Sequence, residues 1–175
     1  ASFDGISTTK SEEKEIPGMK MGDWRSFGKT LIVYEGKAQI PSSNPDEDNL
    51  KYSLLLETHK DVSYSHIFMT FKNVVKGGCY SVSFYDKTLS GKKAPHEFAV
   101  LLGENFEDSE IVYEKKPTSA EKWVKVISNE FCVQSTNLHL RMRVISKDTD
   151  YRAIAIDDVQ LNLRGIYELS KLCLY

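Results

Sequence analysis

The sequence has no long hydrophobic run and no excess of charge of either sign. No apolar stretch approaches the roughly 18–20 residues that a transmembrane helix needs, so we do not expect membrane insertion. The chain has 23 basic and 25 acidic side chains and a net charge of −2. Because a strong basic field and an arginine-rich aromatic groove are both missing, nucleic acid is not an expected partner.

Cysteine is scarce, with only Cys79, Cys132 and Cys173 in 175 residues. None of them is spaced as a metal knuckle or a C-x-x-C pair, so we expect neither zinc binding nor thioredoxin-type chemistry. An odd number leaves one thiol free or intermolecular in a secreted protein. Two states remain open. We favour a bridge between Cys79 and Cys173 that pins the tail to the body, and the alternative is three reduced, buried thiols.

Motifs for nucleophilic or acid–base catalysis are also missing. The sequence has no G-x-S-x-G turn, and its histidines at 59, 66, 96 and 139 lie in separate segments without a partner motif. A glycosidase needs two carboxylates across a cleft. The adjacent Asp157 and Asp158 point to opposite faces of a regular strand, so they cannot flank one bond. We therefore expect the protein not to be an enzyme.

What the sequence does contain is a series of short segments with β-strand periodicity, separated by turn signals. This pattern predicts one all-β domain over residues 1–175, a jelly-roll β-sandwich of two antiparallel sheets. We expect residues 1–28 to be irregular, with Trp24 and Phe27 at the core edge, and Ile166, Leu169 and Cys173 to mark a short helix. The predicted strands are Lys29–Tyr34, Leu50–Glu57, Tyr64–Phe71, Cys79–Tyr85, His96–Leu102, Glu110–Glu114, Trp123–Phe131, Thr136–Ile145 and Arg152–Leu163.

The segment Tyr151–Leu163 alternates like a half-buried strand but breaks phase at Asp157 and Asp158. Such a break predicts a β-bulge, which re-aims a side chain. Two carboxylates in an apolar strand are costly to desolvate unless something compensates them, and Ca²⁺ takes several oxygen ligands. Two interpretations remain open: a bound cation, or one aspartate in solvent while the other caps a turn.

Two groups of residues are candidates for ligand binding. In the strand Leu138–Val144, Arg141 and Arg143 share the face opposite the apolar residues. That face is either simply solvated or a cationic groove for an acidic glycan or partner, since arginine forks bind carboxylate and sulfate. Tyr64, Tyr85 and Tyr113 fall near strand ends. Each ring can stack on the apolar face of a sugar or pack at the edge of the core.

Five motifs occur in the order found in a known superfamily. The chain resembles the galactose-binding-like jelly-roll domains, especially the carbohydrate-binding modules attached to xylanases and cellulases. This resemblance implies a non-catalytic module whose partner is a glycan. The motifs are S-F-D-G (Ser2–Gly5), Y-S-L-L-L (Tyr52–Leu56), K-G-G-C-Y-S-V-S-F-Y-D-K (Lys76–Lys87), E-K-W-V-K-V (Glu121–Val126) and A-I-D-D-V-Q-L (Ala155–Leu161).

The resemblance also implies particular site residues. A structural Ca²⁺ would be held by Asp4 of the opening motif and Asp157 or Asp158 of the closing motif, with backbone carbonyls near Asn49–Lys51 completing the shell. Sugar-binding members use aromatic residues, and Tyr64, with His59 nearby, roughly occupies the place of a Trp and an Arg there. Tyr113 sits where the family often has an aromatic contact. Our expected ligand-binding set is Tyr64, His59, Tyr85, Tyr113, Arg141 and Arg143.

A second resemblance is to MAM adhesion domains. G-D-W-R (Gly22–Arg25) following F-D-G is similar to their D-x-D-W segment, and a Cys79–Cys173 bridge would match their second disulfide, although their first cysteine pair is absent. This resemblance implies an alternative, an extracellular adhesion or interaction module that binds a cell-surface protein. The chain begins at Ala1 rather than Met, and an Ala-Ser start fits signal-peptidase processing, so we expect a secreted or extracellular protein.

Overall fold

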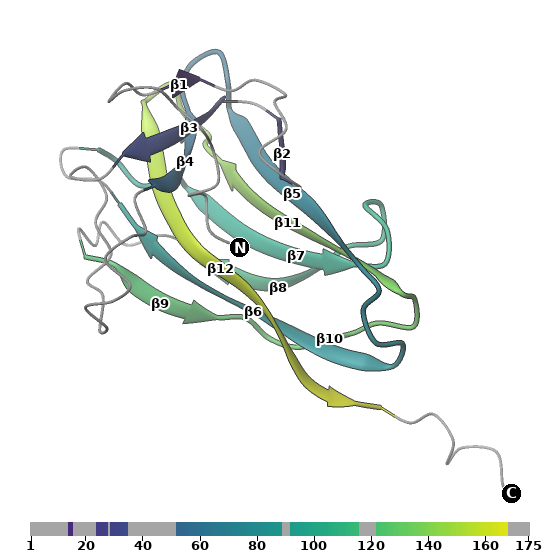
Figure 1. The fold of residues 1–175 in the computed structure, drawn as a ribbon. Coiled ribbons are helices and arrows are strands. Elements are labelled where there is room, and N and C mark those ends of the chain that lie inside the picture. The colour runs from purple at the N-terminus through teal and green to yellow at the C-terminus, as the bar shows by residue number, and fades with distance from the viewer. Residues whose placement is uncertain are drawn as a thin grey trace, which may run out of the picture.

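The structure is a computed structural model that describes residues 14–15, 24–27, 29–34, 52–88, 92–115 and 122–167. All the regular elements in these ranges are β-strands, which are divided between two layers (Figure 1). The strands are β1 (Lys14–Glu15), β2 (Arg25–Phe27), β3 (Lys29–Tyr34), β4 (Tyr52–Thr58), β5 (Tyr64–Lys72), β6 (Gly78–Lys87), β7 (Glu97–Gly103), β8 (Glu110–Lys115), β9 (Val124–Ile127), β10 (Phe131–Cys132), β11 (Asn137–Ile145) and β12 (Arg152–Ile166).

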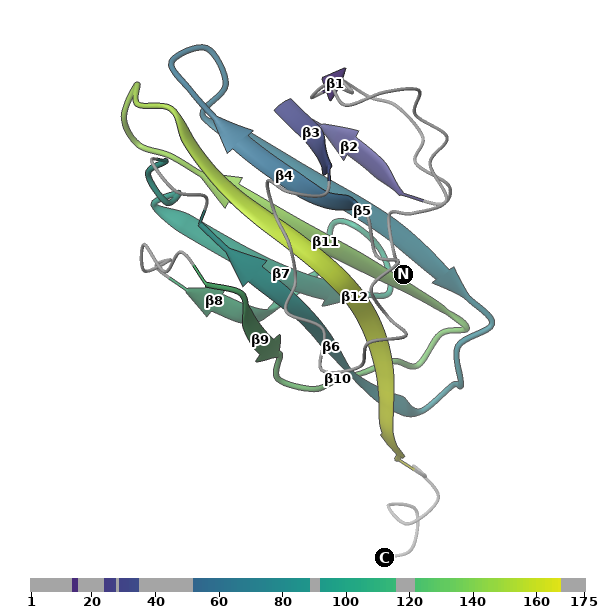
Figure 2. The ribbon, with the colours of Figure 1, turned by 60° about the vertical axis from the view of Figure 1, so that its left-hand side comes forward.

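The strands form two antiparallel sheets that pack face to face (Figure 2). The seven-stranded sheet has the order β1-β3-β4-β12-β6-β10, with β9 also pairing with β6. The five-stranded sheet has the order β2-β5-β11-β7-β8. The predicted all-β jelly-roll sandwich is therefore confirmed. Each predicted strand segment overlaps an observed strand, and Trp123–Phe131 divides into β9 and the start of β10.

Three expectations about the chain ends have different outcomes. The region 1–28, expected to be irregular, contributes β1 and β2 where it is described, because backbone pairing with β3 and β5 adds these short segments to the sheets. Trp24 is buried as predicted, with 3 % of its surface exposed. Ile166, expected in a helix, is the last residue of β12. Asp4, Asn49–Lys51, Leu169 and Cys173 lie outside the described residues.

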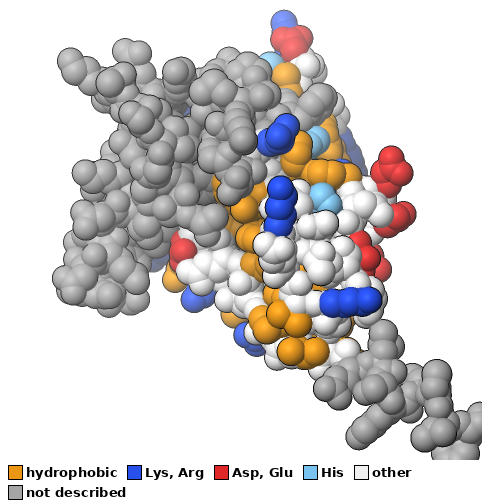
Figure 3. Space-filling model, turned by 45° about the vertical axis from the view of Figure 1, so that its right-hand side comes forward, with side chains coloured by type: hydrophobic (Ala, Val, Ile, Leu, Met, Phe, Trp, Pro, Cys, Tyr) orange, Lys and Arg blue, Asp and Glu red, His pale blue; other side chains and the backbone are white. Residues whose placement is uncertain are grey.

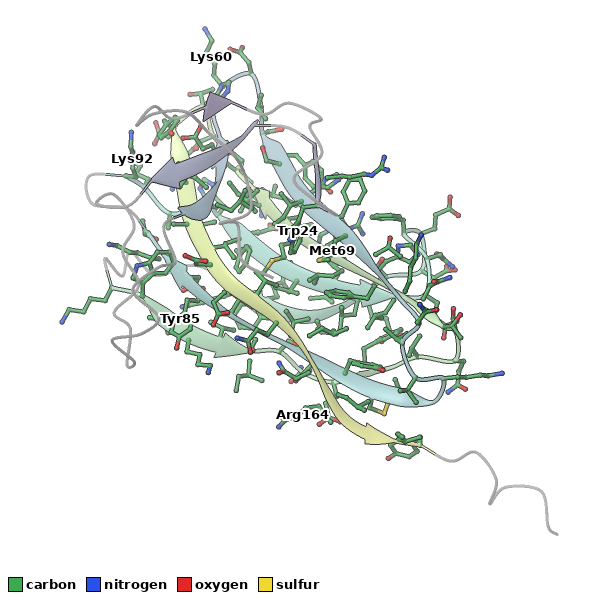
Figure 4. All side chains as sticks on the ribbon, viewed as in Figure 1. Trp24, Lys60, Met69, Tyr85, Lys92 and Arg164 are labelled. Atoms are coloured by element: carbon green, nitrogen blue, oxygen red, sulfur yellow. A yellow bond between two sulfur atoms is a disulfide. The ribbon has the colours of Figure 1, made fainter. Side chains whose placement is uncertain are left out.

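The hydrophobic core fills the space between the sheets. Along β11, alternate residues Leu138, Leu140, Met142 and Val144 are fully buried, as the alternation of side chains on a strand requires. Each such side chain contributes about 1.5–3 kcal/mol of transfer free energy. Trp24 joins this core near Met69, which is also buried (Figure 4).

The disulfide prediction was wrong. Cys79 forms its bond with Cys132, not with Cys173. The two cysteines are direct register partners in the antiparallel pair β6–β10, so the sheet pairing brings their β-carbons together. This pairing depends on a strand neighbourhood that cysteine spacing does not reveal. The bond ties the short strand β10 to the body of the seven-stranded sheet.

The predicted bulge in β12 is confirmed. The register between β12 and β6 shifts between Asp157 and Gln160, and Asp158 adopts a left-handed backbone with φ of 47°. Asp is one of the few residues besides glycine that tolerate this conformation. Within the described ranges, no helix is long and apolar enough to cross a membrane.

Candidate ligand-binding face

The outer surface of the five-stranded sheet carries a row of rings along β5. Because successive side chains point to opposite faces, Ser65, Ile67 and Met69 turn into the core. Tyr64, His66, Phe68 and Thr70 therefore lie on the outer surface, where each is half-buried.

The pairing of β5 with β11 places basic side chains beside these rings. Arg143 lies opposite His66, Arg141 opposite Phe68, and His139 opposite Thr70. All three β11 side chains are half-buried on the outer surface, as their alternation with the buried Leu138–Val144 residues predicted. We call this surface of β5 and β11 the aromatic–arginine face.

The rings on this face form a continuous series of contacts. The Tyr64 and His66 ring centroids are 5.1 Å apart, and those of His66 and Phe68 are 5.5 Å apart. Phe106, from the loop between β7 and β8, meets Phe68 edge to face at 4.7 Å and His139 at 5.0 Å. The series therefore joins two strands and one loop.

The loop that carries Phe106 is held by its own hydrogen bonds. The Asn105 side-chain oxygen accepts from the backbone N–H of Glu107 at 2.9 Å and of Asp108 at 2.8 Å. The Ser109 hydroxyl donates to the carbonyls of Asn105 and Phe106. A Cβ at Gly103 would come within 2.7 Å of the Ser109 Cα, so this close approach requires glycine.

Two histidines, His66 and His139, contribute polar groups to the face. Burial, and after it the charge of Arg141, lower the pKa of His66 to about 4. His66 is consequently neutral near pH 7 and presents one ring N–H donor and one acceptor. The Nδ1 of His139 shares a hydrogen bond with the Thr70 hydroxyl at 2.9 Å. The face thus combines apolar rings with groups that can both donate and accept.

Three arginines belong to this surface. In the sheet register, Phe68 lies between Arg25 on β2 and Arg141 on β11. Among the described residues, Arg25, Arg141 and Arg143 have no carboxylate within the 4.0 Å of an ion pair, and the buried Nε of Arg141 has no hydrogen-bond partner. Figure 3 brings forward the side where β2 and β5 lie in Figure 1, and basic and histidine side chains stand there among hydrophobic ones.

The structure brings together only part of the expected ligand set. Tyr64, Arg141 and Arg143 lie on the aromatic–arginine face, and His59 lies in the β4–β5 connection, where its Nδ1 is 4.0 Å from the Asp61 carboxylate. Tyr85 projects from the outer side of the seven-stranded sheet, with the Lys125 ammonium 5.7 Å from its ring centre (Figure 4).

Tyr113 turns inward and packs on core aromatics. Its ring centroid is 5.7 Å from that of Phe84 and 6.1 Å from that of Phe98. Burial, and after it the charge of Asp86, raise the pKa of Tyr113 to about 12. A bulge between β7 and β8, at Val100 and Leu101, explains why this ring faces the core.

Four ring-bearing residues of the face were outside the expected set: His66, Phe68, Phe106 and His139. The alternation of β5 and β11 already placed three of them beside Tyr64 or Arg141 on the same strand faces. Phe106 has no such signal, because its position depends on how the β7–β8 loop folds over the sheet.

The closing motif supplies a buried carboxylate for the predicted cation. Asp157 has 1 % of its surface exposed, and its Oδ1 accepts from the backbone N–H of Asp158 at 2.7 Å. The Asp158 Oδ1 accepts from the Gln160 amide at 2.8 Å. Within the described part of the chain, no cluster of three or more His, Cys, Asp or Glu is placed to hold a metal. The involvement of Asp4 stays a prediction.

Solved structures share this fold. A family 61 carbohydrate-binding module, TmCBM61, in complex with β-1,4-galactotriose matches 82% of this chain and 90% of its own, with 17% identity and a TM-score of 0.55. The C-terminal family 22 carbohydrate-binding module of Clostridium thermocellum Xyn10B matches 85% and 91%, with 15% identity and a TM-score of 0.56. A cyclase from Fischerella sp. TAU matches 96% of both chains, with 10% identity and a TM-score of 0.64.

These likenesses define the class of fold. The chain shares the jelly-roll fold of these two solved carbohydrate-binding modules, which is the fold that the order of its motifs predicted. No protein-family model matches the sequence. No curated protein matches it significantly either.

Proposed function

We propose that the protein is a non-catalytic carbohydrate-binding module that binds a glycan on the aromatic–arginine face. The observation that carries this proposal is the continuous series of half-exposed rings from Tyr64 through Phe68 to His139, bordered by hydrogen-bonding groups. A module with this fold has been solved with a galactose trisaccharide, which supports a sugar as the class of ligand.

The chemistry of the face suits a sugar. A pyranose ring has an apolar side made of C–H groups, which packs on aromatic rings, and a rim of hydroxyls that both donate and accept. Phe68 offers an apolar surface, while neutral His66 and the arginine N–H groups supply the polar contacts. Rings held by packing and by a strand backbone lose little conformational entropy when a ligand binds.

Calorimetric titration with soluble oligosaccharides tests the proposal. We expect Phe68→Ala to weaken binding by about tenfold or more, since truncating a central aromatic contact costs more than about 1 kcal/mol. Tyr85→Ala is the matched control, because Tyr85 lies on the other sheet. If a broad array of neutral and acidic glycans at high protein concentration gives no binding at all, the proposal is wrong.

The non-catalytic part of the proposal needs its own test, because a cyclase shares the fold. The absence of a nucleophile motif in the sequence supports a binding role. After prolonged incubation with a bound glycan, we expect its chain-length distribution to be unchanged by mass spectrometry. Any new product that depends on the protein would overturn this part.

We also propose a structural Ca²⁺ held by Asp157 together with Asp4. Its support is a carboxylate that is almost fully buried at a β-bulge, between the buried Ile156 and Val159 of the same strand. A bound cation would compensate that charge and tie the first residues of the chain to β12. The melting experiment in the Discussion tests it.

An extracellular location is likewise a proposal. The Cys79–Cys132 disulfide supports it, since such bonds persist mainly in oxidising compartments. The adhesion alternative has less support, because the Cys79–Cys173 bridge that suggested it competes with the observed one. Labelling of intact cells from the natural source, with detection of the protein outside the membrane, tests the location.

A further inference from the structure

Among the described residues, the arginines of the aromatic–arginine face differ from Arg152 and Arg164 in having no carboxylate within ion-pair distance. Elsewhere, Arg152 contacts Asp148 at 2.5 Å, Lys147 contacts Glu97 at 2.8 Å, and Arg164 approaches Glu130 to 3.9 Å. In the described ranges, Arg141 and Arg143 make no such pair. Within the described part of the chain, two neighbouring guanidinium groups therefore have no anionic partner.

The surroundings of these two arginines make an unpaired charge unfavourable. In the sheet register, Arg141 lies between Phe68 and Leu101, and Arg143 lies between His66 and Ala99. Leu101 and Ala99 are buried, so low-dielectric groups flank both arginine stems. Burial of a charge beside apolar groups costs free energy unless an opposite charge compensates it. An incoming anion would supply that compensation.

The spacing suits an anion on an extended ligand. Arg141 and Arg143 are two residues apart on one strand, which separates their α-carbons by about 7 Å. Two guanidinium forks at this spacing can converge on one carboxylate or sulfate, or hold successive charged groups of a chain. Arg25, across Phe68 from Arg141, extends the positive charge over the row of rings.

Among the described residues, Glu97 does not neutralise the pair. Glu97, which feels the charge of Arg143, is engaged by Lys147, and this hydrogen bond is the main reason why the pKa of Glu97 is lowered. His66 is neutral near pH 7, so it adds no positive charge beside Arg141 and Arg143. The local charge is thus positive where the rings would hold a sugar.

We infer that the glycan is acidic, and that Arg141 and Arg143 bind a carboxylate or sulfate group on a sugar that packs against Phe68 and Tyr64. This inference rests on the proposed function, because it assigns the ligand class of the same face. Carboxylate and sulfate share the chemistry that the arginines recognise, and a uronic-acid chain and a sulfated chain are separate arms of the test.

The experiment is a calorimetric titration of the folded protein with four oligosaccharides of equal length. They are an oligogalacturonate, its methyl ester, a sulfated heparin-derived chain and a neutral β-1,4-galactan. We expect at least one acidic chain to bind about tenfold more tightly than the neutral one, because hydrogen bonds to charged groups strengthen binding by at least this factor. The affinity should fall with added salt. The acidic oligosaccharide that binds more tightly shows whether the arginines recognise a carboxylate or a sulfate.

Variants locate the contact. Arg141→Gln and Arg143→Gln should each weaken acidic binding by about tenfold and change galactan binding by less than about threefold. Arg164→Gln is the matched control, since Arg164 lies on β12 of the other sheet. A second readout is the His66 titration by NMR, because a bound anion near Arg141 should raise the pKa of His66 from about 4.

The outcomes separate the two proposals. Equal binding of acidic and neutral chains would overturn this inference and leave the proposed function standing. The inference also fails if Arg164→Gln weakens acidic binding as much as Arg141→Gln does, since the attraction would then be diffuse. Binding of no oligosaccharide at all would overturn the proposed function itself. Circular dichroism of each variant confirms that loss of binding is not loss of folding.

Discussion

Phe106 and Phe68 meet edge to face with ring centroids 4.7 Å apart, one from the β7–β8 loop and the other from the middle of β5. The contact carries the row of rings across the sheet to His139, whose centroid is 5.0 Å from that of Phe106. Without Phe106, the row of ring contacts along β5 would end at Phe68; Phe106 therefore extends this row toward β11. Its position depends on the tight turn after Gly103.

The close approach at Gly103 gives the first prediction. In Gly103→Ala, the new Cβ would lie 2.7 Å from the Ser109 Cα and 2.8 Å from the Asn105 carbonyl oxygen, so the loop must move. We expect a loss of about 1–3 kcal/mol in the free energy of unfolding and weaker glycan binding. Gly165→Ala is the control, because no atom lies within 4 Å of its added Cβ. Equal stability of both variants, from urea melts, would contradict the prediction.

The half-buried His66 predicts a specific pH dependence. Its pKa is lowered from 6.5 to about 4, so the folded state binds its proton less readily than the unfolded state does. The stability from neutral His66 is fully present above pH 6.5 and is lost as the pH falls from 6.5 through 4. Urea melts across this window should show a smaller decline for His66→Gln than for the native protein. Parallel declines would show that another group is responsible.

Asp86 predicts a stabilising substitution. Its side chain is 5 % exposed, and one of its oxygens is buried with no hydrogen-bond partner among the described residues. Burial raises its pKa above the ordinary 3.8. Its contribution is present below pH 3.8 and is lost as the pH rises through the folded-state pKa. Asp86→Asn should therefore raise stability near pH 7 by about 1 kcal/mol and have less effect below pH 4.

The exposed Asp61 provides the control for that experiment, because 71% of its side chain is accessible to solvent. We expect Asp61→Asn to leave the melting temperature unchanged at both pH values. The ionised form of Asp86 also contributes to the raised pKa of Tyr113. If Asp86→Asn is less stable than the native protein near pH 7, Lys115 compensates the Asp86 charge more than its burial costs.

The Cys79–Cys132 bond closes a loop with a sequence separation of 53. On the chain-entropy account, a loop of this length stabilises the folded state by about 4 kcal/mol. The double variant Cys79→Ala/Cys132→Ala should melt at a markedly lower temperature, whereas Cys173→Ala should not. Peptide mapping of the unreduced protein checks the pairing directly, and a Cys79–Cys173 peptide would refute it.

Removal of calcium tests the proposed cation. We expect a chelator to lower the melting temperature and added Ca²⁺ to restore it, since a ligand that binds only the folded state stabilises it. Asp157→Asn should abolish this difference because the buried carboxylate is the proposed ligand. Melting curves that superimpose with and without chelator would show that the proposed calcium site is wrong.

Some features of the candidate site follow from short-range patterns. Alternation along β5 and β11 puts Tyr64 with Phe68, and Arg141 with Arg143, on strand faces opposite the core residues. The phase break at Asp157 and Asp158 predicts the bulge, because an extra residue must shift the period. Alternation cannot say which strands become neighbours, so it left Tyr85 and Tyr113 in the same expected set as Tyr64.

The sequence by itself determined the all-β jelly roll, most of the strands and the bulge at Asp157, because these depend on the periodicity of neighbouring residues. Only the tertiary structure decided that Cys79 bonds Cys132, that Tyr113 packs against the core, and that Phe106 reaches Phe68. The physical reason is common to all three. Each contact joins residues distant in the chain, and sheet register and loop geometry bring them together, which local propensity does not encode.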